Sequence, residues 1–214
     1  MTLARTLGGN LRGIVFDLDR TLIDSRRAWC YAIEESLLAT RGERIDARHL
    51  AEEYQHRPWR DAISIVEPER QHQDRCVRLC EAMYARSAMK RLLVFDGIGM
   101  MLDELRSARI EVGAISRLPH QLARKQIEST GLERFVTVLE SVGDDEPWDA
   151  PELVARCSSF LETAALCYVG TAEDVESVAA LGMPSYIATW PGSSPGHVRE
   201  ALSTPRALIT VLGG

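Results

Sequence analysis

Two aspartates separated by one residue stand at the end of an apolar run near the start of the chain. The run Ile14-Val15-Phe16 has the composition of a buried strand, and Asp17 and Asp19 fall where that strand would end. In an open parallel sheet, ligands bind outside the carboxyl ends of the strands. Carboxylates at that edge can divide the work of nucleophile and general acid/base and can share a cation. The simpler alternative is that both aspartates cap the helix that follows.

The periodicity of apolar residues predicts the elements that position these aspartates. Residues 24–91 have helical spacing throughout, whereas strands and helices alternate from Leu92 onward. Helices are expected at 24–40, from 46, at 59–66, 76–89, 97–109, 118–130, 151 onward, 174–181 and 205 onward, and further strands at 111–115, 135–139, 165–169 and 185–188. This pattern predicts an α/β fold, a parallel sheet covered on both faces, in residues 1–23 and 92–214, with a helical insertion at 24–91.

Composition excludes several classes of function. The 214 residues carry a net charge of -6, which argues against nucleic-acid binding because phosphate backbones are bound by clustered Lys and Arg. No run approaches the roughly 20 apolar residues of a membrane span, and the first ten residues lack a signal-peptide apolar region. The five cysteines are odd in number and lack metal-binding spacing, so reduced thiols are expected. We therefore expect a cytoplasmic protein, and the sequence indicates no oligomeric state.

The stretch Asp17-Leu18-Asp19-Arg20-Thr21 resembles motif I, DxDxT, of the haloacid dehalogenase (HAD) superfamily. Its continuation to Ser25 is similar to the phosphoglycolate phosphatase-like branch, whose Rossmann-like core and inserted helical cap match nearly the whole chain. The resemblance implies Mg²⁺-dependent hydrolysis of a small phosphorylated metabolite, with Asp17 as nucleophile and Asp19 as general acid/base. It also implies that Asp17, Asp19 and Asp174 hold the metal and that Thr21 contacts the phosphate.

Two further stretches resemble the motifs that complete such a site. Ser116 follows the strand at 111–115 as motif II does, which implies a hydrogen bond to a phosphoryl oxygen; a helix N-cap is the alternative. Residues 168–175 are similar to the acidic motif IV. The usual Gly-Asp pair is Gly170-Thr171 here, which leaves Asp174 as the expected metal ligand and Glu173 in reserve. A helix cap is again the alternative.

The family's lysine motif departs furthest, because Trp148 stands where the lysine is expected. Loss of one preorganised charge-stabilising group typically costs about 3–4 kcal/mol of transition-state stabilisation. Arg117, which we also assign to phosphate binding, and Lys125 are the candidate substitutes, but the sequence favours surface positions for both.

The predicted insertion contains a stretch that resembles the family's substrate-contacting cap loop. Arg57, Trp59 and Arg60 would meet the leaving group of the substrate, and Arg20 would lie near the mouth of the site. The alternative is a turn between helices with Trp59 in the core of the cap.

Two other functions compete with phosphatase activity. The changes at Trp148 and Thr171 are compatible with a catalytically impaired protein that binds a phosphorylated ligand or partner without turnover. Dehalogenation of a 2-haloacid is the second alternative, but that reaction does not need the proton donor that Asp19 offers. Sugar-phosphate mutase activity is a weaker variant of the main prediction.

Overall fold

The computed structural model describes residues 11–54, 58–143, 147–161, 166–192 and 201–213. The chain forms two compact units, one from the segments before Asp24 and after Leu93 and the other from Asp24–Leu93. We describe each unit by itself.

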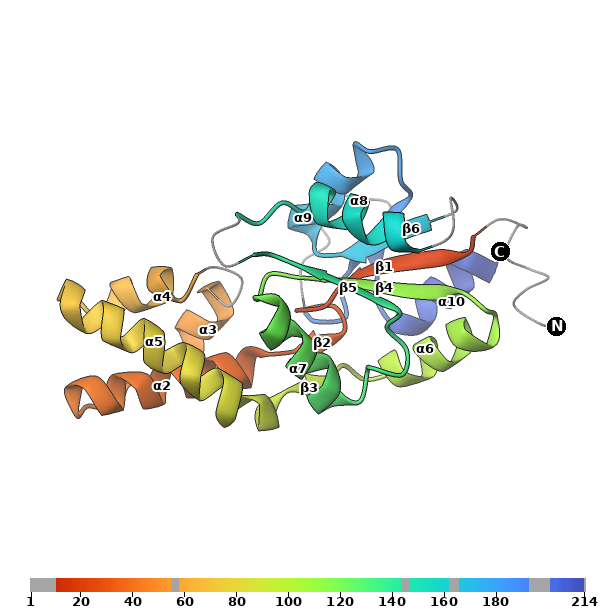
Figure 1. Cartoon of the computed structure of the whole chain (residues 1–214). Coiled ribbons are helices and arrows are strands. Elements are labelled where there is room, and N and C mark those ends of the chain that lie inside the picture. The colour runs from red at the N-terminus through yellow and green to blue at the C-terminus, as the bar shows by residue number, and fades with distance from the viewer. Residues whose placement is uncertain (1–10, 55–57, 144–146, 162–165, 193–200, 214) are drawn as a thin grey trace. The chain divides into compact units, whose positions relative to one another are not determined.

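The first unit is built on a parallel sheet of six strands (Figure 1). Their order across the sheet is β5 (Val138–Ser141), β4 (Glu111–Ser116), β1 (Gly13–Asp17), β6 (Leu166–Gly170), β7 (Ser185–Ala188) and β8 (Ala201–Leu202). Every neighbouring pair is parallel. β1 is buried along its whole length, as its apolar sequence requires of a central strand.

Helices cover both faces of this sheet. On one face α8 (Ala150–Phe160) packs on β5, β4 and β1, and α9 (Ala172–Ala179) packs on β6 and β7. α6 (Ile98–Ser107) and α10 (Pro205–Gly213) pack together on the other face (Figure 1). α7 (His120–Thr130) packs on β5 and connects β4 to it.

The strand register brings three loops to one edge of the sheet. Asp17, the last residue of β1, lies opposite Ile115, so Ser116 follows one residue further along β4. On the other side of β1, Phe16 lies opposite Val169, so Thr171 follows just beyond the end of β6. The carboxyl ends of β1, β4 and β6 therefore supply the candidate site.

The second unit is helical. It contains α2 (Arg26–Arg41), α3 (Arg48–Tyr54), α4 (Trp59–Val66), α5 (Arg70–Arg86) and the 3₁₀ helix η1 (Ala88–Arg91). β2 (Ile23–Asp24) and β3 (Leu93–Val94) form a separate two-stranded sheet. An aromatic cluster lies in the core of the helical unit: the rings of Trp29 and Trp59 stack at 3.7 Å, and Tyr84 meets both edge-on.

The predicted fold class, a parallel α/β sheet with a helical region, is confirmed. Several boundaries differ. α5 begins at Arg70 rather than at residue 76, because its first turns are mostly polar and carry no apolar signal. β5 begins three residues later than expected, since Phe135 closes a turn onto the carbonyl of Leu132. The short strand β8 was not predicted.

The remaining fold-level expectations concern caps, thiols and membrane spans. Asp24, the first residue of the helix expected at 24–40, lies one residue before the N-cap Ser25, and its carboxylate accepts the backbone N–H of Arg26. All five cysteines are free thiols. Within the part of the chain that the structure describes, no helix has the length and apolarity needed to cross a membrane.

Candidate active site

Asp17 is a buried carboxylate without a hydrogen-bond donor. Its side chain is 1% exposed, and neither carboxylate oxygen has a partner among the described residues. Burial, followed by the neighbouring charge of Asp174, raises the pKa of Asp17 well above its usual value, while Arg117 acts in the opposite direction. A buried, unpaired carboxylate is costly in a folded protein unless a ligand completes it.

Asp19, in contrast, is held by donors from two neighbouring elements. The Ser116 hydroxyl at the end of β4 donates to Asp19 Oδ2 at 3.1 Å, and the Gln126 amide on α7 donates to Oδ1 at 3.1 Å. Ser116 also accepts the backbone N–H of Leu118. Ser116 lies at the same sheet edge as Asp17, and its hydroxyl bonds Asp19. These bonds fix the orientation of the Asp19 carboxylate.

Asp174 is surrounded by three donor side chains. Arg117 Nη2 lies 2.9 Å from Oδ2 and 3.2 Å from Oδ1, the indole N–H of Trp148 donates to Oδ1 at 2.9 Å, and the Thr171 hydroxyl donates to Oδ2 at 3.1 Å. A carboxylate offers about four lone-pair positions, so these contacts fill them. The Arg117 guanidinium also lies over the Trp148 ring at 4.0 Å.

The buried donors near these carboxylates include three without an acceptor among the described residues: the hydroxyls of Thr21 and Tyr168, and Arg117 Nε. The Thr21 hydroxyl follows Asp17 on the same loop, and Arg117 Nε belongs to the guanidinium that binds Asp174. Each is buried without a hydrogen-bond partner among the described residues. Buried polar groups without partners in the protein can be satisfied by a bound ligand or ion. The arrangement is suited to a ligand that carries oxygen acceptors together with a cation.

The loop between the two aspartates turns tightly. The carbonyl of Leu18 accepts the backbone N–H groups of Leu22 and Ile23, and Arg20 adopts a left-handed conformation with φ of 64°. This turn lets one short loop supply both carboxylates. Arg20 also lies close enough to Asp17 to oppose the rise of its pKa. Of the two proposed substitutes for the lysine, Arg117 reaches the site, whereas Lys125 is exposed.

The three residues predicted to contact substrate from the insertion have different positions. Trp59 is 7% exposed and stacks on Trp29 in the core of the helical unit. Arg60 is exposed and pairs with Asp74. Arg57 lies outside the described residues. Trp59 therefore has a packing role, which was the alternative raised from the sequence.

The fit to Mg²⁺ differs among the predicted ligands. The unpartnered oxygens of Asp17 suit a hard cation, which prefers oxygen ligands. Asp174 would have to release one of its donors to coordinate a metal directly. Among the described residues, no group of three His, Cys, Asp or Glu side chains is arranged to hold a metal ion. Two carboxylates, one backbone carbonyl, phosphate and water, the set that the family resemblance implies, do not require such a group.

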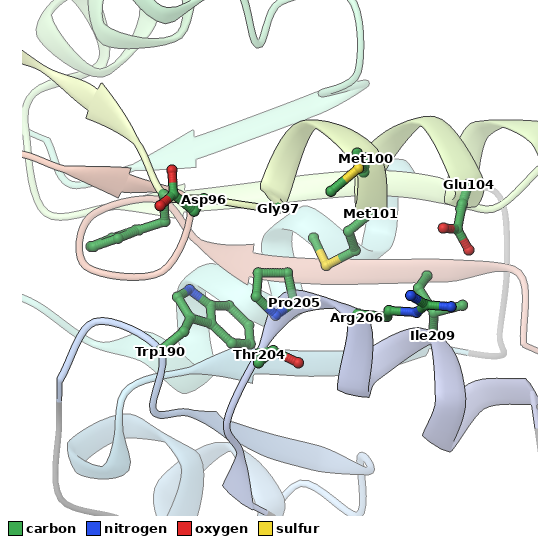
Figure 2. A pocket seen from close by; sticks show the side chains of 11 residues that line it. Asp96, Gly97, Met100, Met101, Glu104, Trp190, Thr204, Pro205, Arg206 and Ile209 are labelled. Atoms are coloured by element: carbon green, nitrogen blue, oxygen red, sulfur yellow. The ribbon is translucent and has the colours of Figure 1, made fainter.

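A separate cavity of about 580 Å³ lies between α6 and α10 (Figure 2). Met100, Met101, Pro205 and Ile209 supply much of its apolar lining, and Trp190 closes one side. The indole N–H of Trp190 donates to the carbonyl of Thr21. None of the predicted site residues lines this cavity.

Sequence reasoning missed Gln126 and the contacts of Trp148. Gln126 is fully buried on α7 near Ala123 and Ile127, and a polar residue on the buried face of a helix was a signal that could have been used. Trp148 was identified only by the lysine it replaces. No motif or spacing in the sequence indicates that residues 117, 148 and 174 are in contact.

Comparison with known proteins finds related proteins over most of the chain. Residues 14–188 match the family described as haloacid dehalogenase-like hydrolase. The phosphoglycolate phosphatase of Xanthomonas campestris pv. campestris is 28% identical over 190 residues, which cover 84% of this chain and 83% of that protein. A phosphoglycolate phosphatase of Xylella fastidiosa is 28% identical over 186 residues, covering 84% and 80%.

Solved structures share the fold at lower sequence identity. A haloacid dehalogenase-like family hydrolase from Streptococcus pneumoniae superposes with a TM-score of 0.79 at 15% identity and covers 94% of this chain and 98% of its own. A HAD-superfamily hydrolase of subfamily IA from Geobacter sulfurreducens has a TM-score of 0.78 at 18% identity and covers 96% and 98%. The match over residues 14–188 and the shared fold show that this chain belongs to the haloacid dehalogenase-like hydrolases, in their phosphoglycolate phosphatase-like branch.

Proposed function

We propose that this protein is a Mg²⁺-dependent phosphatase of a small phosphate monoester. The observation that carries the proposal is the buried, unpaired carboxylate of Asp17, together with two buried, unpaired donors: Thr21 Oγ1 on the same loop, and Nε of Arg117, whose charge acts on Asp17. A phosphoryl group would supply acceptors to those donors. A cation would balance Asp17, whose pKa is raised by burial and by Asp174.

In the proposed mechanism Asp17 attacks phosphorus and forms an aspartyl-phosphate as the ester oxygen leaves. Asp19, oriented by Ser116 and Gln126, protonates the leaving oxygen. It then takes a proton from the water that attacks the aspartyl-phosphate, which regenerates Asp17. Thr21 and Arg117 bind the phosphoryl oxygens. Ser116 can take part only if its hydroxyl turns away from Asp19.

The residues that would hold Mg²⁺ are Asp17, through its carboxylate, and Asp19, through its backbone carbonyl. Bound Mg²⁺ supplies charge stabilisation for the phosphoryl oxygens and reduces the repulsion between Asp17 and the substrate. That Asp174 also binds the metal stays a prediction. Its oxygens accept hydrogen bonds from Arg117, Trp148 and Thr171, so one of these donors would have to move away first.

We propose 2-phosphoglycolate as the first substrate to test, because the relatives from Xanthomonas and Xylella are phosphoglycolate phosphatases. We also propose that the helical unit acts as the cap over the site, with Arg57, Arg60 and Arg20 as candidate contacts to the substrate. The free thiols are compatible with a cytoplasmic location.

The test is release of inorganic phosphate from 2-phosphoglycolate and from p-nitrophenyl phosphate, with Mg²⁺ and with EDTA, by the wild type and Asp17→Asn. We expect release that requires both Mg²⁺ and Asp17. Equal background release by both proteins would refute the proposal. Binding of phosphate without turnover would then support the catalytically impaired alternative, and halide release from chloroacetate without metal would support the dehalogenase alternative.

A further inference from the structure

Arg117 and Trp148 come from different loops, yet they form one structural unit with Asp174. The guanidinium lies 4.0 Å from the centre of the indole ring, and both side chains donate to the Asp174 carboxylate. An arginine on an aromatic face with a carboxylate at one end keeps little rotational freedom. The unit therefore fixes the position of a positive charge at the edge of the sheet.

The Arg117 guanidinium has one donor that its contacts with Asp174 leave unpaired. The hydrogen bonds to Asp174 come from Nη2, while Nε is buried and has no acceptor among the described residues. Arginine has five N–H donors in a rigid plane that suits phosphate oxygens. A structural ion pair that merely neutralised Asp174 would have no need to bury a spare N–H. The unpaired donor indicates a ligand with an oxygen anion.

We propose that Trp148 and Asp174 are positioning residues that hold Arg117, and that Arg117 supplies the positive charge that binds the phosphoryl group beside Asp17. This inference rests on the proposed function. It also gives Trp148 a definite role. Its ring stacks on the Arg117 guanidinium and its N–H donates to Asp174, so the positive charge comes from position 117 and not from position 148. Asp174 then acts as the anchor of Arg117.

The test measures binding of inorganic phosphate by calorimetry, in EDTA and in Mg²⁺, together with kcat and KM for p-nitrophenyl phosphate. In Arg117→Met we expect phosphate affinity to fall about 10- to 100-fold, the equivalent of one or two charge-assisted hydrogen bonds. We expect kcat to fall on the order of 100-fold. Trp148→Phe keeps an aromatic face but loses the N–H, so its loss should be smaller.

Arg106→Met is the matched control. Arg106 also pairs with an aspartate, Asp103, and lies over an aromatic ring, that of Phe135 at 5.1 Å, but it has no contact with the site residues. Its phosphate affinity should equal that of the wild type. Arg117→Lys keeps the charge and should retain more phosphate affinity than Arg117→Met. If one of the two variants fails to fold, the phosphate affinity of the other still tests the proposal.

A rescue experiment separates positioning from simple stability. The Trp148 N–H lies 2.9 Å from Asp174, so a lysine at position 148 can bring an ammonium group to the same carboxylate. We expect Arg117→Met with Trp148→Lys to recover part of the phosphate affinity and of kcat that Arg117→Met alone loses. A merely structural role of the two residues would give no recovery.

The outcomes also separate this inference from the proposed function. Phosphate binding that depends on Arg117 and Trp148 in a protein that releases no phosphate from esters would support the inference and refute the function. Turnover by the wild type with unchanged affinity and kcat in Arg117→Met would refute the inference and leave the function intact. Failure of Trp148→Lys to improve on Arg117→Met would refute the shared role of the two positions.

Discussion

Asp17 and Asp19 stand two residues apart, yet their surroundings differ in a way that suits different tasks. Asp19 has donors from Ser116 and Gln126, which hold it in one orientation, as the proposed proton transfer requires. Asp17 has none, so its oxygens remain available to a cation and to phosphorus. Leaving a carboxylate buried without donors costs stability, and that cost is expected at a site built for a ligand.

The first prediction concerns the pH dependence of this cost. The pKa of Asp17 is raised by burial from its ordinary value of 3.8, so the folded state keeps its proton to higher pH than the unfolded state does. Stability therefore falls as pH rises from the ordinary value through the folded-state pKa. In EDTA, Asp17→Asn should be more stable than the wild type at pH 7, and the difference should vanish near pH 3.

Urea denaturation of both proteins across this pH range measures the difference in the free energy of unfolding. The other ionisable groups are common to the two proteins, so their contributions largely cancel. A wild type as stable as Asp17→Asn at pH 7 would show that the carboxylate is satisfied in the apo protein.

The second prediction concerns the donor to Asp19 that sequence reasoning missed. Gln126→Leu removes the amide that holds Asp19 Oδ1. A hydrogen bond to a charged group is worth about 1.5–3 kcal/mol, so kcat for phosphate release should fall at least about tenfold with little change in KM. Gln121→Leu, an exposed change on the same helix, is the control. A similar loss in both variants would point to a general effect on α7.

Sequence reasoning at this scale worked where a local motif carries the information. Asp17, Asp19 and Ser116 were placed from strands that end in polar residues, and the parallel register brings those ends together. The Arg117–Trp148–Asp174 unit was beyond such reasoning. Its contacts depend on how three loops leave the sheet, which neither periodicity nor propensity specifies.

The packing of α8 on the sheet depends on a glycine in the middle of β4. A Cβ on Gly113 would lie 2.4 Å from Cys157 Sγ and 3.1 Å from Leu161, so the strand accepts the helix only because position 113 has no side chain. Close approach of this kind is a common reason for glycine inside a strand.

The third prediction follows from that contact. Gly113→Ala should lower the free energy of unfolding by about 1–3 kcal/mol through overpacking. Cys157→Ala removes the sulfur that the new methyl group would meet, so the double variant should be more stable than the sum of the single changes implies. Gly99→Ala is the control, because a Cβ there meets nothing within 4 Å. Additive effects of the two substitutions would contradict this account of the interface.

At the scale of elements, the sequence indicated secondary structure best where apolar residues mark it. The expected strand at 185–188 agrees with β7, and the helix expected at 59–66 agrees with α4. The polar first turns of α5 and the two residues of β8 carry too little apolar pattern to be found. Their positions are set by tertiary packing, which overrides local preference.

At the scale of the whole molecule, two units with separate cores share one chain. The sheet has its own apolar core around Val15 and Tyr168, and the helical unit has its aromatic cluster of Trp29, Trp59 and Tyr84. A ligand that binds one unit stabilises that unit directly. Thermal unfolding can therefore show which unit holds the metal, provided that the two transitions are analysed separately.

The fourth prediction is that Mg²⁺ stabilises the unit that contains Asp17. At a concentration about 100 times its Kd, a ligand specific for the folded state adds about 2.7 kcal/mol, which for a chain of this size corresponds to a rise in Tm of about 5–10 °C. Calorimetry of the wild type in EDTA and in Mg²⁺ should show this rise in the transition of the sheet unit. Asp17→Asn should abolish it, because the carboxylate with free oxygens is gone.

Trp59→Phe, which alters the aromatic cluster, identifies the transition of the helical unit. A rise that persists in Asp17→Asn would place the metal elsewhere, and no rise in the wild type would contradict a metal site at Asp17.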